Sequence, residues 1–379
     1  MPSLLNRLHA GVYTSVFGWL ARRRPPQPAP VELDGDSRVL LFSCAGIGDT
    51  LTDSVVFRAL KETYPGIHLA AVVHHKRRAL LEHNPYVDQI FEMRKGLPAF
   101  LRRHGQLSAA GPWSAILQLR GNDPEPRCQS FRLNPDVTFS TPNMTRLSHL
   151  CGHQVEQPEW DQTHGVLQTL RLAKAVGAET ADPTLVYEVT PEERAILEDR
   201  LRRFEVGDRP RLVFQIGGGR RASWRDWPER HWAALAVHLE RNEDLDAEII
   251  LLGGPDNAAR ADEVSRMLDV FSVRHHNLCG RLPLELSAAL CQSARVVVST
   301  DTGVMHLSFA VGARVVALIH CNNPAPRVGP FGYGDRHRVV QLPKPEGYTG
   351  PWDADMGAIQ PRDHVAPGVM ELWREAGKS

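Results

Sequence analysis

Short apolar runs alternate with amphipathic stretches along most of this chain, and these two patterns predict strands and helices respectively. In the first half, strands are predicted at 39–43, 68–73, 87–91 and 113–119. Helices are predicted at 50–64, 77–82 and 163–178, the first with Leu51, Val55 and Leu60 on one face. Strands that alternate with helices in this way predict a parallel sheet with crossover helices.

The second half shows the same alternation without repeating the sequence. Strands are predicted at 211–216, 247–252, 295–299 and 314–319. Helices are predicted at 228–240, 257–268, 307–312 and 365–376. We therefore expect two Rossmann-like halves, joined near residues 180–208.

Residues 121–160 interrupt the alternation. They show little periodicity and hold five prolines, at 124, 126, 135, 142 and 158. Long irregular regions inside compact domains are usually functional or mobile. We therefore predict a long irregular loop here.

The N-terminus has its own pattern. Apolar residues recur at helical spacing over 3–24, three arginines end this stretch, and a proline-rich run follows to residue 30. The stretch is too short and too polar to span a bilayer, and its charges follow the apolar run, the reverse of a secretory signal. Two interpretations stay open: a helix lying on the inner face of the cytoplasmic membrane, or a helix packed on protein.

Composition narrows the function classes. The 379 residues include 44 basic and 44 acidic side chains, a balance that does not point to nucleic acid. The six cysteines show neither CxxC spacing nor a paired framework, which favours reduced thiols in a cytoplasmic protein. A zinc site at Cys151 and His153 is disfavoured, because no second ligand pair has metal-site spacing.

A glycine-rich turn follows the first predicted strand. Gly46 and Gly48 begin like a dinucleotide fingerprint, but Leu51 stands at the third glycine position. No acidic residue ends the next strand, so an NAD-binding role is disfavoured. Asp49 then has two interpretations: the cap of a helix, or a carboxylate that acts as a general base.

A second glycine-rich turn combines backbone amides with arginines. Three glycines precede three arginines and a helix that starts with proline, a combination that suits a diphosphate. The alternative is a solvated basic turn, and the lysine and hydroxyl of a Walker A motif are missing. The candidate residues are Gly217, Gly218, Gly219, Arg220, Arg221 and Arg225.

The strand predicted at 295–299 runs into Asp301, Thr302 and Gly303, and then into a helix. A helix that starts at the carboxyl end of a parallel strand offers free N–H groups to an anion. His306 could donate to a phosphate or pack as an ordinary histidine. Asp256, which follows another strand, could accept from ribose hydroxyls or cap a helix. An Asp-x-Asp pair at 353–355 is disfavoured as a metal site.

These motifs together resemble glycosyltransferase family 9, the ADP-heptose–lipopolysaccharide heptosyltransferases. The resemblance covers residues 38–345 and is carried by five runs: 46–49 (Gly-Ile-Gly-Asp), 84–88 (Asn-Pro-Tyr-Val-Asp), 225–228 (Arg-Asp-Trp-Pro), 253–256 (Gly-Gly-Pro-Asp) and 301–306 (Asp-Thr-Gly-Val-Met-His). It implies an α/β fold of GT-B architecture, with two Rossmann-like domains whose parallel sheets face a central cleft. The implied domains are 31–185 for the acceptor and 186–350 for the nucleotide sugar. Residues 351–379 are expected to pack back on the first domain.

The resemblance also implies residue roles. Asp49 matches the proposed catalytic base, beside an acceptor-side loop with Gly46, Gly48 and Arg120. Arg225 stands where the family usually has a phosphate-binding lysine, and Asp256 where a glutamate contacts the nucleoside. The donor-binding segment supplies Asp301, Thr302, Gly303 and His306.

The implied activity is an inverting, metal-independent transfer of a sugar to a hydroxyl of a cell-surface glycan such as lipopolysaccharide core. The expected donor is ADP-heptose, and no cofactor is expected. Departures from the family, arginines at 220–221 in place of threonines and Asp53-Ser54 in place of a small residue and proline, leave the acceptor open. Two alternatives remain: a nucleotide-sugar epimerase or hydrolase, and a non-catalytic sugar-nucleotide-binding protein.

Overall fold

The computed structural model describes residues 32–121, 123–142, 152–218 and 220–378, together with four single residues at 15, 19, 147 and 150. The side chains at 220–222 are not described. Apart from two of its residues, the helix expected at 3–24 lies outside this range, as do the proline-rich linker, Cys151 and Gly219. In the part that is described, no helix is long and apolar enough to cross a membrane. The chain divides into two compact units, with the boundary between Pro183 and Thr184.

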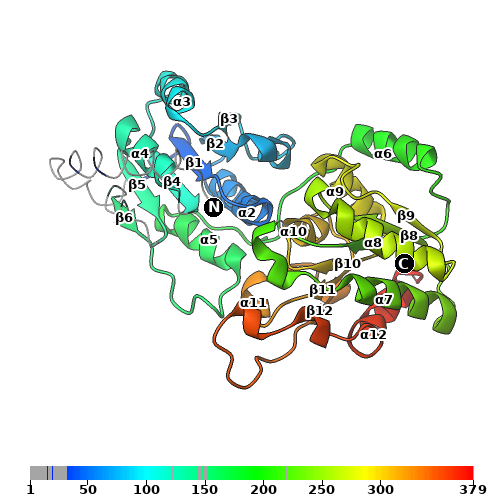
Figure 1. Ribbon diagram of the computed structural model, residues 1–379. Coiled ribbons are helices and arrows are strands. Elements are labelled where there is room, and N and C mark those ends of the chain that lie inside the picture. The colour runs from blue at the N-terminus through cyan, green and yellow to red at the C-terminus, as the bar shows by residue number, and fades with distance from the viewer. Residues whose placement is uncertain are drawn as a thin grey trace. The chain divides into compact units, whose positions relative to one another are not determined.

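The first unit is built on a parallel sheet (Figure 1). In its described residues the strand order is β3-β2-β1-β4-β5-β6, the order of a Rossmann fold. Most of the strands are apolar on both faces and fully buried, as strands of a parallel sheet between two helical layers must be. The strands are β1 (Arg38–Ser43), β2 (His68–His74), β3 (Gln89–Met93), β4 (Ala115–Arg120), β5 (Val137–Ser140) and β6 (His153–Gln154).

Helices cover this sheet in two pairs: α2 (Ile47–Thr63) packs on α5 (Gly165–Ala175), and α3 (Leu97–Ala110) packs on α4 (Pro124–Leu133). The turn from β1 into α2 sets the Gly46 loop at the carboxyl edge of the central strand. The helix predicted at 77–82 is instead a short 3-10 helix, η1 (His75–Leu80).

The second unit repeats this architecture, with strand order β12-β11-β10-β7-β8-β9 in its described residues. Its strands are β7 (Arg211–Gln215), β8 (Glu248–Leu252), β9 (His275–Asn277), β10 (Val296–Thr300), β11 (Val315–Leu318) and β12 (His337–Val340). Its longer helices are α6 (Pro191–Arg203), α7 (Glu229–Asn242), α8 (Ala258–Val270), α9 (Leu284–Ser293), α10 (Gly303–Ala310) and α12 (Ala366–Ala376), with a short α11 (Ala325–Val328). The central strands β7 and β10 again end at loops that carry predicted site residues.

The predicted irregular loop at 121–160 is wrong, because α4, β5 and β6 lie within it. Two of its prolines occupy the first turn of α4, where a backbone N–H has no helical partner to lose. Asp123 caps the helix by accepting a hydrogen bond from the N–H of Glu125 at 3.1 Å. These two prolines therefore belong to the start of a helix and not to a loop.

The C-terminal segment belongs to the second unit. Its buried side chains, among them Ile359, Val369 and Leu372, lie in one hydrophobic core with β7, β8 and α7. The indole N–H of Trp227 donates to the Ile359 carbonyl at 2.9 Å. We expected residues 351–379 to pack back on the first domain, but the structure places this segment in the core of the second.

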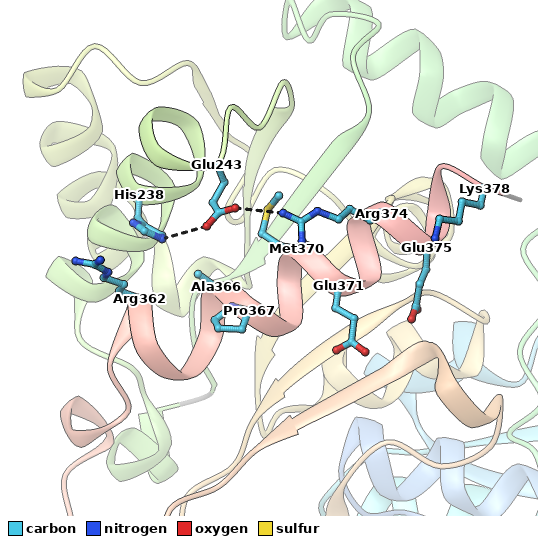
Figure 2. A pocket seen from close by; sticks show the side chains of 10 residues that line it. All are labelled: His238, Glu243, Arg362, Ala366, Pro367, Met370, Glu371, Arg374, Glu375 and Lys378. Carbon is cyan, nitrogen blue, oxygen red and sulfur yellow. Dashed lines mark hydrogen bonds and ion pairs between the residues drawn. The ribbon is translucent and has the colours of Figure 1, made fainter.

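A surface groove of about 510 Å³ lies between α7 and α12 (Figure 2). Its walls carry both charges, and these are partly paired with each other: Glu243 lies 3.4 Å from Arg374 and 3.9 Å from His238. The groove shares no residue with the predicted site.

The C-terminal core generates a stability prediction. Leu372→Ala removes a fully buried side chain and should lower the free energy of unfolding of the second unit by about 2–5 kcal/mol. Val270→Ala, at an α8 position that is 79% exposed, should change it by less than about 0.5 kcal/mol. Urea unfolding of both variants measures the difference. Equal stability of the two variants would show that α12 does not contribute to the core.

Candidate functional site

In the first unit, Asp49 lies in the first turn of α2. One of its oxygens, Oδ2, accepts the backbone N–H of Gly46 at 2.9 Å, so the carboxylate caps the helix. A side chain at Gly46 would collide with that oxygen, because a Cβ there would lie 2.9 Å from it. The Asp49 side chain nevertheless stays 42% exposed. Both interpretations of Asp49 therefore fit, since a capping carboxylate that is partly exposed and has a second oxygen outside the cap can also take a proton.

Arg120, at the end of β4, lies beside that second oxygen. Its Nη1 is 3.5 Å from Asp49 Oδ1. Its Nε and Nη2 donate to the Thr169 hydroxyl at 3.1 and 2.9 Å, and Nη2 also donates to the Gly165 carbonyl. The start of α5 thus fixes the guanidinium, and the absence of a side chain at Gly165 leaves room for it. The acceptor-side residues Gly46 and Arg120 meet at Asp49, whereas Gly48 lies in the helical turn itself.

One turn further along α2, Asp53 is a carboxylate with no exposed surface. The Ser43 hydroxyl donates to its Oδ2 at 2.7 Å, and Arg120 Nε lies 3.7 Å from its Oδ1. Burial raises the pKa of Asp53 to about 7, against the opposing effect of the Arg120 charge. We did not predict Asp53 as a site residue. The spacing of two carboxylates four residues apart at a helix start is the signal that could have identified it.

In the second unit, hydrogen bonds with side chains hold the loop after β7 in place. Asp226 Oδ1 accepts the N–H of Gly218 at 3.0 Å, and the Gly217 carbonyl accepts from Gln215 and Asn257 at 2.6 and 3.1 Å. A Cβ at Gly217 would lie 2.9 Å from Asp226 Oδ1, so the loop needs glycine there. One amide predicted to bind a diphosphate therefore already serves a carboxylate of the chain.

Asp226 is itself held by Arg260 of α8, which sequence reasoning missed. Arg260 Nη1 donates to Asp226 Oδ2 at 2.5 Å, and Nη2 donates to the Trp227 carbonyl at 2.9 Å. Its Nε lies 3.0 Å from Glu229. Nothing is described of the side chains of Arg220 and Arg221, so their predicted role stays a prediction.

Arg225 follows in the same loop and forms an ion pair with Asp301. Its Nη1 lies 3.0 Å from Asp301 Oδ2, the oxygen that also accepts from Asn323 Nδ2 at 2.6 Å. Asp301 is 3% exposed and the Arg225 side chain 27%. Arg225 Nε is a buried donor that has no hydrogen-bond partner among the described residues, so the ion pair with Asp301 leaves part of the hydrogen-bonding capacity of this guanidinium unused.

The helix after Asp301 is α10, capped by Thr302. The Thr302 hydroxyl accepts the N–H of Met305 at 3.4 Å and donates to Gln215 Oε1 at 3.2 Å. Gly303 is the first helical residue. The first N–H groups of α10 therefore point away from the helix body at the carboxyl edge of β10, close to the Arg225–Asp301 pair.

The positions of the other predicted residues say less about function. His306 packs its ring on Phe309 of the same helix, with ring centres 5.2 Å apart. Asp256 lies exposed in η4 (Pro255–Asn257). Asp353 accepts three hydrogen bonds from residues 349–350, and Asp355 accepts the N–H of Gly357, so both carboxylates close local turns. Among the described residues, no group of three or more His, Cys, Asp or Glu could hold a metal ion.

Comparison with known proteins identifies related chains. The model of glycosyltransferase family 9 (heptosyltransferase) matches residues 139–347. Lipooligosaccharide heptosyltransferase 2 of Haemophilus influenzae is 23% identical over 318 residues, which cover 76% of this chain and 84% of that protein.

Solved structures show the same fold. A family 9 glycosyltransferase from Veillonella parvula superposes with a TM-score of 0.74 at 18% identity, over 91% of this chain and 99% of that chain. The Escherichia coli ADP-heptose lipopolysaccharide heptosyltransferase II gives 0.73 at 19% identity, over 90% and 99%. With the two parallel sheets, these likenesses confirm the predicted α/β fold and GT-B architecture.

Proposed function

The chain belongs to glycosyltransferase family 9 and is a glycosyltransferase, and we propose that it transfers heptose from ADP-heptose to a hydroxyl of a lipopolysaccharide-type glycan. The observation that carries the proposal is the cluster of Arg225, Asp301 and the α10 N-terminus. The family match at 139–347 includes this cluster.

The cluster suits a nucleoside diphosphate sugar. A guanidinium with spare donors and the N–H groups at a helix start are the two features that most often bind phosphate oxygens. Asp301 already pairs with Nη1 of Arg225, so a diphosphate would compete with the Asp301 carboxylate for the guanidinium. The adenine and heptose parts of the donor come from the likeness to the Escherichia coli enzyme, whose name includes ADP-heptose.

In the proposed reaction, the Asp49 carboxylate takes the proton of the acceptor hydroxyl as its oxygen attacks the anomeric carbon. The bond from that carbon to the diphosphate breaks, and ADP leaves with the electron pair. A single displacement inverts the anomeric configuration. Arg225 and the α10 dipole stabilise the negative charge that grows on the diphosphate, which is why the proposal includes no metal ion.

The acceptor we propose is lipid-linked, so the reaction would take place at the cytoplasmic face of a membrane. The expected membrane contact through residues 3–24 falls almost entirely outside the described residues.

Arg225 should be needed for nucleotide binding. Arg225→Ala removes charge-assisted hydrogen bonds to the diphosphate and should raise the Kd for ADP by about 10–100-fold in titration calorimetry. Arg266→Ala, which removes a 71% exposed arginine of α8, is the matched control and should leave the Kd unchanged. Equal ADP affinity of the two variants would exclude Arg225 from the donor site.

Asp49 should be needed for turnover but not for donor binding. An amide at this position can still accept the Gly46 N–H, so Asp49→Asn should fold and bind ADP like the parent. Loss of the base should lower kcat for acceptor-dependent ADP release by about 10²-fold or more. Full activity of this variant would remove Asp49 from the mechanism. ADP release from ADP-heptose without any acceptor would indicate a hydrolase instead.

A further inference from the structure

The proposed base has a buried neighbour for which the proposed reaction has no use. Asp49 and Asp53 lie one turn apart on α2, and an oxygen of each faces the guanidinium of Arg120. The distances are 3.5 Å from Nη1 to Asp49 and 3.7 Å from Nε to Asp53. One cation is thus shared by an exposed and a fully buried carboxylate.

Arg120 cannot easily turn toward either carboxylate alone. Hydrogen bonds to the Thr169 hydroxyl and the Gly165 carbonyl hold its Nε and Nη2 against α5. These bonds fix the plane of the guanidinium and leave Nη1 directed toward Asp49. A change of charge on Asp53 is therefore transmitted to Asp49 through a cation that stays in place.

Burial of the ionised Asp53 carboxylate costs folding free energy. The Ser43 hydroxyl is the one hydrogen-bond donor that the described structure gives it, and its Oδ1 accepts no hydrogen bond. A buried carboxylate with so few partners destabilises a fold in its ionised form. The fold gains little from Asp53, which points to a role in the site.

We propose that Asp53 is a positioning residue for the base: by sharing Arg120 with Asp49, it controls how strongly the guanidinium neutralises Asp49. The inference rests on the proposed function of Asp49. An ionised Asp53 offsets part of the positive charge of Arg120 and repels the negative charge of Asp49. Asp49 therefore attracts the acceptor proton more strongly. A protonated Asp53 leaves Arg120 to Asp49 alone, and Asp49 becomes a weaker base.

The switch between these states lies near neutral pH, because burial raises the pKa of Asp53 to about 7. Activity should therefore rise as the pH increases through this value. Cys44 stays neutral there because burial raises the pKa of its thiol. The polar and charged groups around the two carboxylates are Ser43 of β1, Cys44 directly after it, Arg120 of β4 and Arg77 of η1. The Gly165 carbonyl and the Thr169 hydroxyl of α5 contact the Arg120 guanidinium.

The test is the pH dependence of kcat at saturating donor and acceptor. The parent enzyme should show an inflection near pH 7, and Asp53→Asn should lose it while the donor KM changes less than about twofold. Ser54→Ala, which removes another buried polar group of α2, is the matched control and should keep the inflection. An unchanged profile in Asp53→Asn overturns the proposal, as does a loss of activity equal at every pH.

A second variant keeps the proposal testable if Asp53→Asn does not fold. Ser43→Ala removes the one hydrogen bond that favours the ionised form of Asp53, so the inflection should move to higher pH by roughly 0.5–1 unit. An inflection that stays where it was contradicts the proposal.

A measurement without substrate separates this inference from the proposed function. In protein labelled with ¹³C-aspartate, the carboxyl signal missing from Asp53→Asn should titrate near pH 7, and the Nε–H signal of Arg120 should follow it. If both do so but the enzyme transfers no heptose, the proposed function fails and the coupling stands. A carboxyl that titrates near its ordinary value, or an Arg120 signal that does not respond, overturns the inference.

Discussion

Helices that follow parallel strands begin with N–H groups that have no partner inside the helix, and the candidate site residues of each unit depend on how these groups are satisfied. In the first unit the Asp49 carboxylate accepts the Gly46 N–H. In the second, Thr302 caps α10, and Asp226 accepts the N–H of Gly218 in the loop after β7. The chain's own side chains thus occupy some of the donors at these turns, and the proposed function assigns the remaining ones at the start of α10 to an anionic ligand.

Arginines from other elements hold the carboxylates at these turns. Arg120 reaches Asp49 from β4, Arg260 reaches Asp226 from α8, and Arg225 reaches Asp301 within the second unit. Each pair compensates the cost of a partly or fully buried charge. Such pairs also position the groups that the proposed reaction uses, since a guanidinium with several donors can hold a carboxylate and a phosphate together.

Continuous apolar runs predicted the central strands and the loops after them, because strands of a parallel sheet are buried on both faces. The hydrophobic pattern did not predict helices that are polar or only weakly periodic. The helices α3, α6 and α9 were not predicted, and α4 was predicted as a loop. Site residues next to a glycine turn could be predicted. Arg260 and Asn323 could not, because each contacts a carboxylate that is distant in the sequence and that only the fold brings near. The spacing of Asp53 from Asp49 was visible in the sequence, but the contact of Asp53 with Arg120 of β4 depends on the tertiary structure.

We propose that the Arg225–Asp301 cluster and the start of α10 bind an adenine nucleotide without a metal ion. Titration calorimetry of the parent protein with ADP, UDP and GDP, each with and without EDTA, measures this binding. We expect selective binding of ADP with the same Kd in both conditions. Binding that disappears with EDTA, or no binding of ADP at all, would contradict it.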